Sequence, residues 1–165
     1  MGASKPESLF IQRIHRAMGA HAPYHLKVNM PLAGGIPDVY YSGDGGDMWV
    51  EYKYDPRAGM GVRFVQPNLS PLQTRWLNQR WKEGRQVAVI LGCETGVMIY
   101  QHGKWTVPMA PSFFQSNLVS EQEAANFILK RTTKWGQSEL PSPESSGSSS
   151  PSSSGEPPSS GASTS

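Results

Sequence analysis

Asp38, Glu51 and Lys53 are the residues whose types and spacing are best suited to chemistry. A glycine-rich turn at Asp44-Gly45 lies midway between the two acids. An antiparallel hairpin about that turn places Asp38 opposite Glu51, with Cβ atoms roughly 5 Å apart. Lys53 follows Glu51 by two residues and therefore points to the same side of its strand. Two carboxylates held this close need a neutralising cation, and their oxygens favour a divalent metal.

Such a group of side chains matches what phosphodiester hydrolysis requires. Metal ions bind the scissile phosphate, activate a water and neutralise charge on the leaving oxygen. A lysine beside them orients that water or stabilises the charge at phosphorus. The simpler interpretation is structural: Asp38 would be a strand-entry acid after Pro37, and Glu51 and Lys53 would be a solvent-facing pair. The joint placement of the three residues favours the catalytic interpretation.

The element before the hairpin is a predicted amphipathic helix over residues 5–20. Ser4 is a candidate N-cap, and Glu7 follows it at the N3 position. Glu7 also begins the spacing that Ile11, Ile14 and Met18 continue, so it lies on the inward stripe of the helix. Glu7 therefore has two interpretations, a capping box with Ser4 or an acid of the active site.

A second helix is predicted from Ser70-Pro71, an N-cap followed by proline at the first helical position, to about Glu83. Gln73 likewise has two interpretations, since Ser70 and Gln73 form a capping-box pattern and Gln73 could also line the site. The loop at 55–69 before this helix is expected to be mobile.

The predicted fold class is α/β, with a mixed sheet flanked by helices. We expect strands at 25–30, 36–42, 48–54, 86–92 and 96–101, an edge strand at 104–107, and a last helix at 120–134. In the hairpin, Val39, Tyr41, Val50 and Tyr52 point away from the acids and should pack on helices.

Composition divides the chain into one domain over residues 1–138 and a tail over 139–165. In the last 25 residues, 21 are Ser, Pro or Gly, so we expect the tail to be disordered. All 15 basic residues lie before residue 139, and the first 138 residues carry a net charge of +5. This charge fits a polyanionic partner. The candidate phosphate contacts are Arg57, Arg63, Arg75, Arg80, Lys82 and Arg85.

Cys93 is the single cysteine, which excludes an internal disulfide and favours a reducing compartment. Its position after an apolar run indicates a buried structural thiol rather than a nucleophile. The sequence has no signal peptide and no apolar stretch of membrane-spanning length. We therefore expect a cytoplasmic protein with no membrane partner.

Two separated patterns resemble a known group of enzymes. Gly35-Ile36-Pro37-Asp38 followed by Glu51-Tyr52-Lys53 resembles the signature of the PD-(D/E)xK nucleases. Leu69-Ser70-Pro71-Leu72-Gln73, a tryptophan-bearing helix that ends in glycine and the strand QVAVILG are similar to the virus-type replication-repair nuclease (VRR-NUC) branch. Glu7 matches an additional acid of that branch and of archaeal-type Holliday-junction resolvases. The resemblance spans roughly residues 7–100.

This resemblance implies a restriction-endonuclease-like core with elements in the order αβββαββ, followed here by the C-terminal helix. It implies that Mg²⁺ (or Mn²⁺) is bound by Asp38, Glu51 and the backbone carbonyl of Tyr52. Glu7 would bind the metal directly or through water, and Lys53 would be the catalytic lysine.

The resemblance further implies that Gln73 contributes to the site from the second helix. The loop between Lys53 and Gln73 is longer than the spacing usual for the branch. Small members of the group are often phage-encoded homodimers that cut branched DNA in the host-cell cytoplasm.

The expected function is therefore a metal-dependent DNA endonuclease that acts on branched DNA such as a Holliday junction. Two alternatives stay open. One is a nuclease for linear or nicked DNA, in host DNA degradation or end processing. The other is a non-catalytic DNA-binding or virion protein on a nuclease scaffold.

Overall fold

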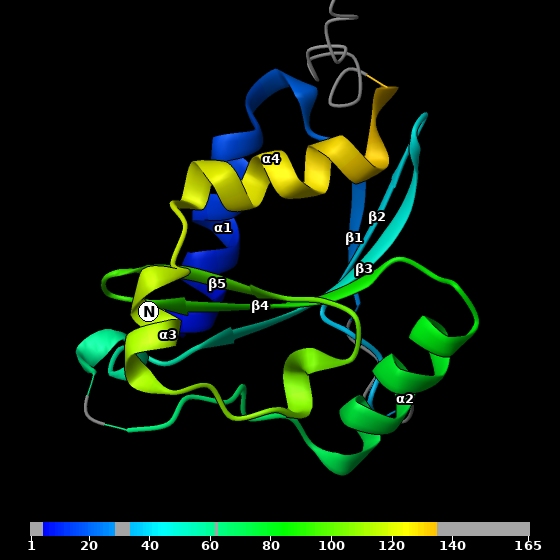
Figure 1. Ribbon diagram of the computed structural model, residues 1–165. Helices are drawn as coiled ribbons and strands as arrows, with labels where there is room; N and C mark the ends of the chain where they lie inside the picture. Colours follow the sequence, from blue (N-terminus) through cyan, green and yellow to red (C-terminus); the bar gives the residue numbers. More distant parts are fainter. Residues whose placement is uncertain (1–4, 29–33, 62, 135–165) are drawn as a thin grey trace, which may run out of the picture.

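A five-stranded mixed sheet lies between two layers of helices in the computed structural model, which describes residues 5–28, 34–61 and 63–134 (Figure 1). The strands are β1 (Tyr24–Lys27), β2 (Val39–Gly43), β3 (Gly46–Tyr54), β4 (Val87–Cys93) and β5 (Gly96–Tyr100). The α-helices are α1 (Pro6–Met18), α2 (Pro71–Lys82), α3 (Pro111–Ser116) and α4 (Glu121–Thr132). Short 3-10 helices are η1 (Gly19–His21), η2 (Ala58–Met60) and η3 (Lys104–Thr106).

The sheet has the order β1-β2-β3-β4-β5. Strands β3 and β4, which α2 connects, pair in parallel, and the other neighbouring strands of the described residues pair antiparallel. The turn at residues 44–45 sets the predicted hairpin register, with Val39 opposite Val50 and Gly43 opposite Gly46. The order αβββαββ followed by a C-terminal helix is thus confirmed, with α3 as an additional short helix before α4.

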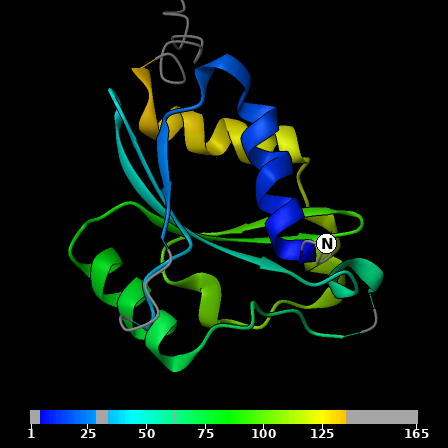
Figure 2. The same cartoon turned by 180° about the vertical axis from the view of Figure 1, so that it is seen from behind.

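Each face of the sheet has its own core. One face packs on α1 and α4 and carries Val39, Tyr41, Val50 and Tyr52, as the alternation predicted. The other face packs on α2, α3 and η3 through side chains of β4 and β5 (Figure 2). Strand β1 is exposed along its whole length, and on this second face Leu26 of β1 is 51% exposed. The second face is therefore covered over β4 and β5 and open over β1 and β2.

Helix α1 begins one residue later than the capping box predicted. Its N-cap is Lys5, with no side-chain hydrogen bond to the cap, and Pro6 occupies the first turn. Glu7 is then the second helical residue, so the capping-box interpretation of Glu7 is wrong. Phe10, one turn later, packs its ring on Tyr52 and Tyr54 at 5.9 and 5.8 Å between centroids. This contact fixes the start of α1 near the end of β3.

Residues 104–107 do not form the predicted edge strand. His102 and Gly103 adopt positive φ values of 54° and 76°, which turns the chain into η3. Trp105 in η3 is fully buried and donates from Nε1 to Asn78 Oδ1 of α2 at 3.0 Å. A buried indole with a partner on α2 stabilises this turn better than an exposed edge could.

The described part of the 55–69 loop is anchored rather than loose, which differs from the mobile loop expected. Ala58 is buried, Gln115 of α3 donates to the carbonyl of Gly59 at 3.0 Å, and Val65 pairs with Met109 in an isolated bridge. These contacts tie the loop to α3, a helix that the sequence did not predict, and to Met109 in the segment before it.

The predicted tail over residues 139–165 lies outside the described residues, as does Ser4. None of the helices in the described ranges has the length and apolar character needed to span a bilayer. Cys93 is buried, and its Sγ donates to the carbonyl oxygen of Gly96 at 3.3 Å, in keeping with a structural thiol.

Candidate active site

Asp38 directly precedes β2 and is held by hydrogen bonds on both sides. Its carbonyl oxygen accepts from the backbone N–H of Val28 at 2.8 Å, which continues the pairing with β1. Its carboxylate Oδ2 accepts from the backbone N–H of Tyr52 at 2.8 Å, across the hairpin. Asp38 therefore faces β3 beside Glu51, as the register requires.

The glycine before Asp38 brings this segment against α2. Gly35 has a φ of 96°, a conformation that L side chains rarely adopt. A Cβ at Gly35 would lie 2.6 Å from the backbone carbon and oxygen of Leu72, in the first turn of α2. Glycine is thus required twice at this position, by conformation and by close approach. The contact explains why the segment leading to Asp38 lies beside the start of α2.

Glu51 is fully buried, with 0% of its surface exposed, and forms an ion pair with Lys53. The Lys53 ammonium lies 2.6 Å from Glu51 Oε1, and the lysine side chain remains 19% exposed. Glu51 Oε2 is buried as well and has no hydrogen-bond partner among the described residues. A buried carboxylate oxygen without a partner lowers the stability of the fold, so Glu51 is held here at a cost.

Gln73 combines the two roles that were alternatives in the sequence. Its side-chain Oε1 accepts from the backbone N–H of Ser70 at 2.9 Å. The backbone N–H of Gln73 donates to Ser70 Oγ at 3.2 Å, which completes the predicted capping box. Its Nε2 also donates to Glu51 Oε1. One amide therefore caps α2 and contacts the buried acid, because its two ends serve different partners.

Burial and neighbouring charges shift the pKa of both Glu51 and Lys53. Burial, with the nearby charge of Asp38, raises the pKa of Glu51 to about 7, although Lys53 opposes the shift. Burial lowers the pKa of Lys53, but the hydrogen bond with Glu51 and the charges of Glu51, Glu7 and Asp38 outweigh it and raise the pKa overall. The amine is therefore a fixed positive charge at neutral pH, and the acid titrates near neutrality.

Glu7 lies within electrostatic range of the cluster from the start of α1. Burial raises its pKa, the charge of Lys53 lowers it and that of Asp38 raises it. Within the described ranges, however, no three Asp, Glu, His or Cys side chains come close enough together to hold a metal ion. The structure thus brings Asp38, Glu51, Lys53 and Gln73 into one cluster, with Glu7 at its margin.

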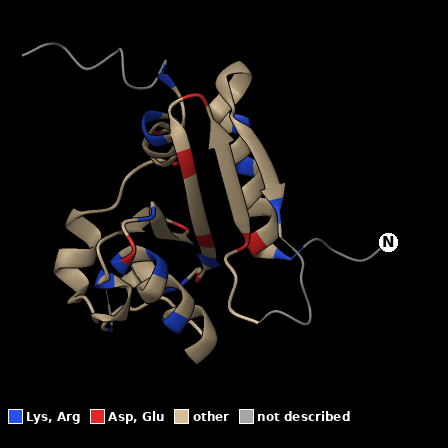
Figure 3. Ribbon diagram, turned by 90° about the vertical axis from the view of Figure 1, so that its right-hand side faces the viewer, with Lys and Arg blue, Asp and Glu red and all other residues tan. Residues whose placement is uncertain are grey.

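The basic candidates divide by location. Arg75, Arg80 and Lys82 lie on α2, which carries several basic residues and faces the viewer in Figure 3. Arg85 is exposed in the turn after α2. Arg57 is exposed in the loop after β3, and Arg63 forms an ion pair with Asp55 there. Four of the six candidates therefore surround α2, the helix that contacts Glu51.

No protein-family model matches the chain, and no curated protein matches its sequence. A search of solved structures finds a likeness to Hjc, a Holliday junction resolvase from the archaeal hyperthermophile Archaeoglobus fulgidus. The match has 13% identity and a TM-score of 0.43, and it covers 72% of this chain and 97% of the other. A TM-score this low is a weak likeness, so the chemistry proposed below depends on the site itself.

Aromatic residues beside the acids are the part of this surface that sequence reasoning did not assign to a site. Tyr40 and Trp49 lie directly opposite each other in the hairpin, and Trp76 of α2 packs on Trp49. A signal for them was available: Tyr40 follows Asp38 by two residues and Trp49 precedes Glu51 by two, so both share the face of the acids.

Proposed function

We propose that this chain is a metal-dependent DNA endonuclease that hydrolyses phosphodiester bonds at Asp38, Glu51 and Lys53. The observation that carries the proposal is the burial of Glu51. Its Oε2 has no hydrogen-bond partner among the described residues, and the side chains of Asp38 and Lys53 lie beside it. Structural ion pairs at a surface do not need a buried, incompletely satisfied carboxylate. Buried acids of this kind, with a shifted pKa, are instead typical of sites that bind and activate charged substrates.

The donor set fits a hard divalent cation. Asp38 and Glu51 offer carboxylate oxygens, and Glu51 Oε2 is an acceptor whose desolvation a cation would offset. We propose that these two acids and the Tyr52 carbonyl hold Mg²⁺ or Mn²⁺, with Glu7 contributing directly or through water. When bound, the ion supplies Lewis-acid activation of a water and neutralises charge on the phosphate.

The protein groups then have separate tasks. The Lys53 ammonium, which stays charged at neutral pH, holds the attacking water or the non-bridging phosphate oxygens beside Glu51. Gln73 fixes the Glu51 carboxylate through Oε1, so that Oε2 keeps its orientation. Asp38 is fixed in turn by the Tyr52 N–H. Each reacting group is thus positioned before substrate arrives.

For the substrate, we propose branched DNA such as a Holliday junction, cut by a homodimer that places one site on each of two strands. Support comes from the motif resemblance and from the basic residues around α2. The competing substrate is linear or nicked duplex. The competing function is DNA binding without cleavage, and the buried acid cluster argues against it, because an inert scaffold gains no stability from that cluster.

The test of cleavage is plasmid nicking with and without Mg²⁺ or Mn²⁺. Wild type should nick only with the metal, and Glu51→Gln and Lys53→Ala should reduce nicking by roughly 100-fold or more, the range for losing an electrostatic catalytic group. Both variants should still bind DNA. Matched controls are Glu94→Gln and Lys130→Gln, which change exposed residues of the β4–β5 turn and of α4. Full nicking by either active-site variant would refute the mechanism.

The test of substrate is a comparison of four-way junctions with linear duplexes of the same sequence. The branched-DNA proposal expects faster cleavage of the junction, and sedimentation should show a dimer. If the linear duplex is cut at least as fast, the chain is instead a nuclease of linear DNA.

A further inference from the structure

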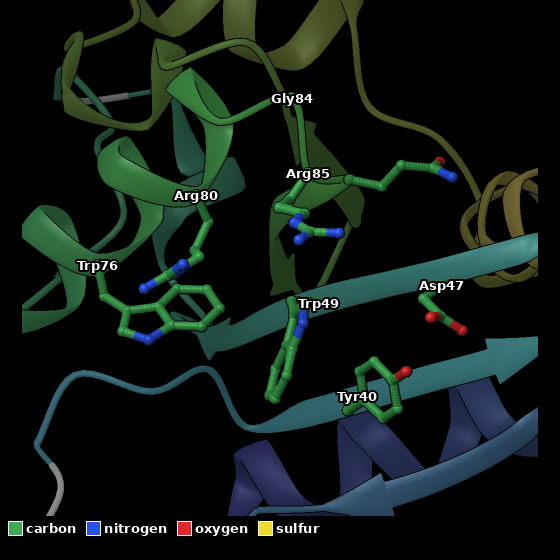
Figure 4. A pocket seen from close by; sticks show the side chains of 8 residues that line it. Tyr40, Asp47, Trp49, Trp76, Arg80, Gly84 and Arg85 are labelled. Atoms are coloured by element: carbon green, nitrogen blue, oxygen red, sulfur yellow. The ribbon is translucent and has the colours of Figure 1, made fainter.

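A hollow of about 570 Å³ lies between α2 and the open part of the second sheet face, lined by side chains of β2, β3 and α2 (Figure 4). Tyr40 and Trp49 form its floor, with ring centroids 4.7 Å apart. Trp76 reaches it from α2 and packs edge-on against Trp49 at 5.2 Å. In Figure 4 the side chains from the strands and those from α2 point into the same space.

This aromatic floor is continuous with the acid cluster. Tyr40 of β2 follows Asp38 by two residues, and Trp49 precedes Glu51 by two residues on the neighbouring strand β3. Two residues correspond to roughly 6.6 Å of strand, so the rings lie next to the acids on the same face. On α2, Gln73, Trp76 and Arg80 follow helical spacing, which places one stripe of the helix over both acids and rings.

Arginines border the hollow on its α2 side. The Arg80 guanidinium lies 5.6 Å from the Trp76 ring centroid and is also paired with Glu83 at 2.6 Å. The exposed Arg85 lines the hollow as well, and in Figure 4 its guanidinium points toward Trp49. Asp47 marks the far end from the acids. A floor of aromatic rings with basic groups at its rim is the combination that proteins use to bind unpaired nucleotides.

The aromatic rings that line the hollow are only partly covered by the rest of the protein. Tyr40, Trp49 and Trp76 are all only partly buried, whereas the aromatic residues Trp105 and Phe114 of the same face are 0% exposed. Leu26, opposite Tyr40 in the register, is 51% exposed and extends the apolar surface across β1. This face therefore presents flat ring area to solvent next to a site proposed to hold a phosphodiester.

We propose that the hollow is a stacking subsite for an unpaired nucleotide of the DNA strand whose phosphodiester is bound at Asp38 and Glu51. The proposal rests on the proposed function and specifies its substrate: DNA with a single-stranded segment beside the cut. A base stacks on the Tyr40–Trp49 floor, and Arg80 and Arg85 contact its flanking phosphates. Bases inside an intact duplex are already stacked and cannot enter, so opened strands are favoured over blunt duplex.

The test measures binding in EDTA, where cleavage does not interfere, with fluorescently labelled DNA. The probes are a blunt duplex, the same duplex with a single-stranded arm, and that arm with abasic sites. Wild type should bind the armed duplex more tightly than the abasic one by roughly tenfold, since only the bases differ. Equal affinity for normal and abasic arms would overturn the proposal without any mutation.

Variants locate the effect. Trp49→Leu keeps an apolar, though smaller, side chain and removes the ring, and it should lose the same factor of roughly ten on the armed duplex while blunt duplex binding is unchanged. Trp49→Phe should retain most of the affinity. Arg85→Gln should weaken binding of every probe and reduce its salt dependence, and Lys130→Gln on α4 is the matched control. Melting curves confirm that each variant folds.

Two further outcomes refute the subsite. If Trp49→Leu weakens blunt and armed duplexes equally, Trp49 has a structural role only. If sedimentation shows a dimer that Trp49→Leu dissociates and the arm preference is absent, a second copy of the chain occupies this face. A parallel nicking assay with Mg²⁺ keeps the two proposals apart, because a chain that binds the arm but never cuts refutes the nuclease and leaves the subsite standing.

Discussion

Replacing Glu51 by glutamine should make the metal-free protein more stable at alkaline pH. The side chain is fully buried, and burial raises the pKa of Glu51 from its ordinary value of 4.5 to about 7. Its carboxyl group therefore holds its proton more tightly in the folded chain than in the unfolded chain. The free energy of unfolding falls as pH rises between these two pKa values, because the unfolded chain then binds fewer protons. Each pKa unit corresponds to 1.36 kcal/mol, so the total loss is about 3 kcal/mol above pH 7.

Glutamine resembles the protonated acid in shape and does not ionise. At about pH 8 in EDTA, Glu51→Gln should exceed wild type by about 3 kcal/mol, which corresponds to roughly 10 °C in Tm for a domain of this size. Below pH 4.5 the two proteins should melt within about 2 °C of each other, since wild-type Glu51 is then protonated as well. Lys53 is 19% exposed and keeps contact with water in the variant, so its charge is not stranded.

Thermal unfolding followed by circular dichroism across this pH range measures the difference directly. Glu94→Gln, an exposed glutamate in the turn between β4 and β5, is the control and should track wild type throughout. A Glu51→Gln protein that is no more stable than wild type at about pH 8, or one whose advantage persists unchanged below pH 4.5, would refute the argument that the buried charge is costly.

Three further predictions concern the same cluster. Mg²⁺ or Mn²⁺ in excess should raise the Tm of wild type at about pH 8 and leave Asp38→Asn unchanged, since ligands that bind only the folded state stabilise it; equal shifts in both would remove Asp38 from the metal site. Gly35→Ala should lower the free energy of unfolding by about 2 kcal/mol or more and slow nicking, because the added Cβ would lie 2.6 Å from the Leu72 backbone. Gly19→Ala is the control: Gly19 also has a positive φ but lies in open space, so the change should cost about 1 kcal/mol and leave nicking normal. Ser70→Ala should cost about 1 kcal/mol through the lost cap but keep nicking, while Gln73→Ala should lose both, as denaturant titration and the nicking assay would report. Normal nicking by Gln73→Ala would show that its contact with Glu51 has no catalytic value.

The hairpin and α2 were predictable because local signals define them. The turn at Asp44-Gly45 fixes the register that places Asp38 beside Glu51, and Ser70-Pro71 fixes the start of α2. Both depend on residues close together in the chain. The face that packs on helices followed from alternation alone, as Val50 and Tyr52 are buried under α1 and α4.

Features that depend on distant contacts were not predictable. Residues 104–107 have strand-like composition, but the buried Trp105 and its bond to Asn78 decide their conformation. The anchoring of the 55–69 loop depends on α3, whose contacts no local pattern indicates. The burial of Glu51, and the absence of a hydrogen-bond partner for its Oε2 among the described residues, depend on how α2 packs over the sheet. The sequence shows only that an acid is present.

The double engagement of Gln73 has a mechanical consequence. The side-chain amide of Gln73 links the first turn of α2 to Glu51 on β3, so a shift of either element strains or breaks this contact. Helix α2 also carries Arg75, Arg80 and Lys82, which under the proposed function would contact phosphates of the bound DNA. If the proposed function holds, a bound strand that displaced α2 would also move the Glu51 carboxylate, and a poorly fitting strand would leave that carboxylate misaligned.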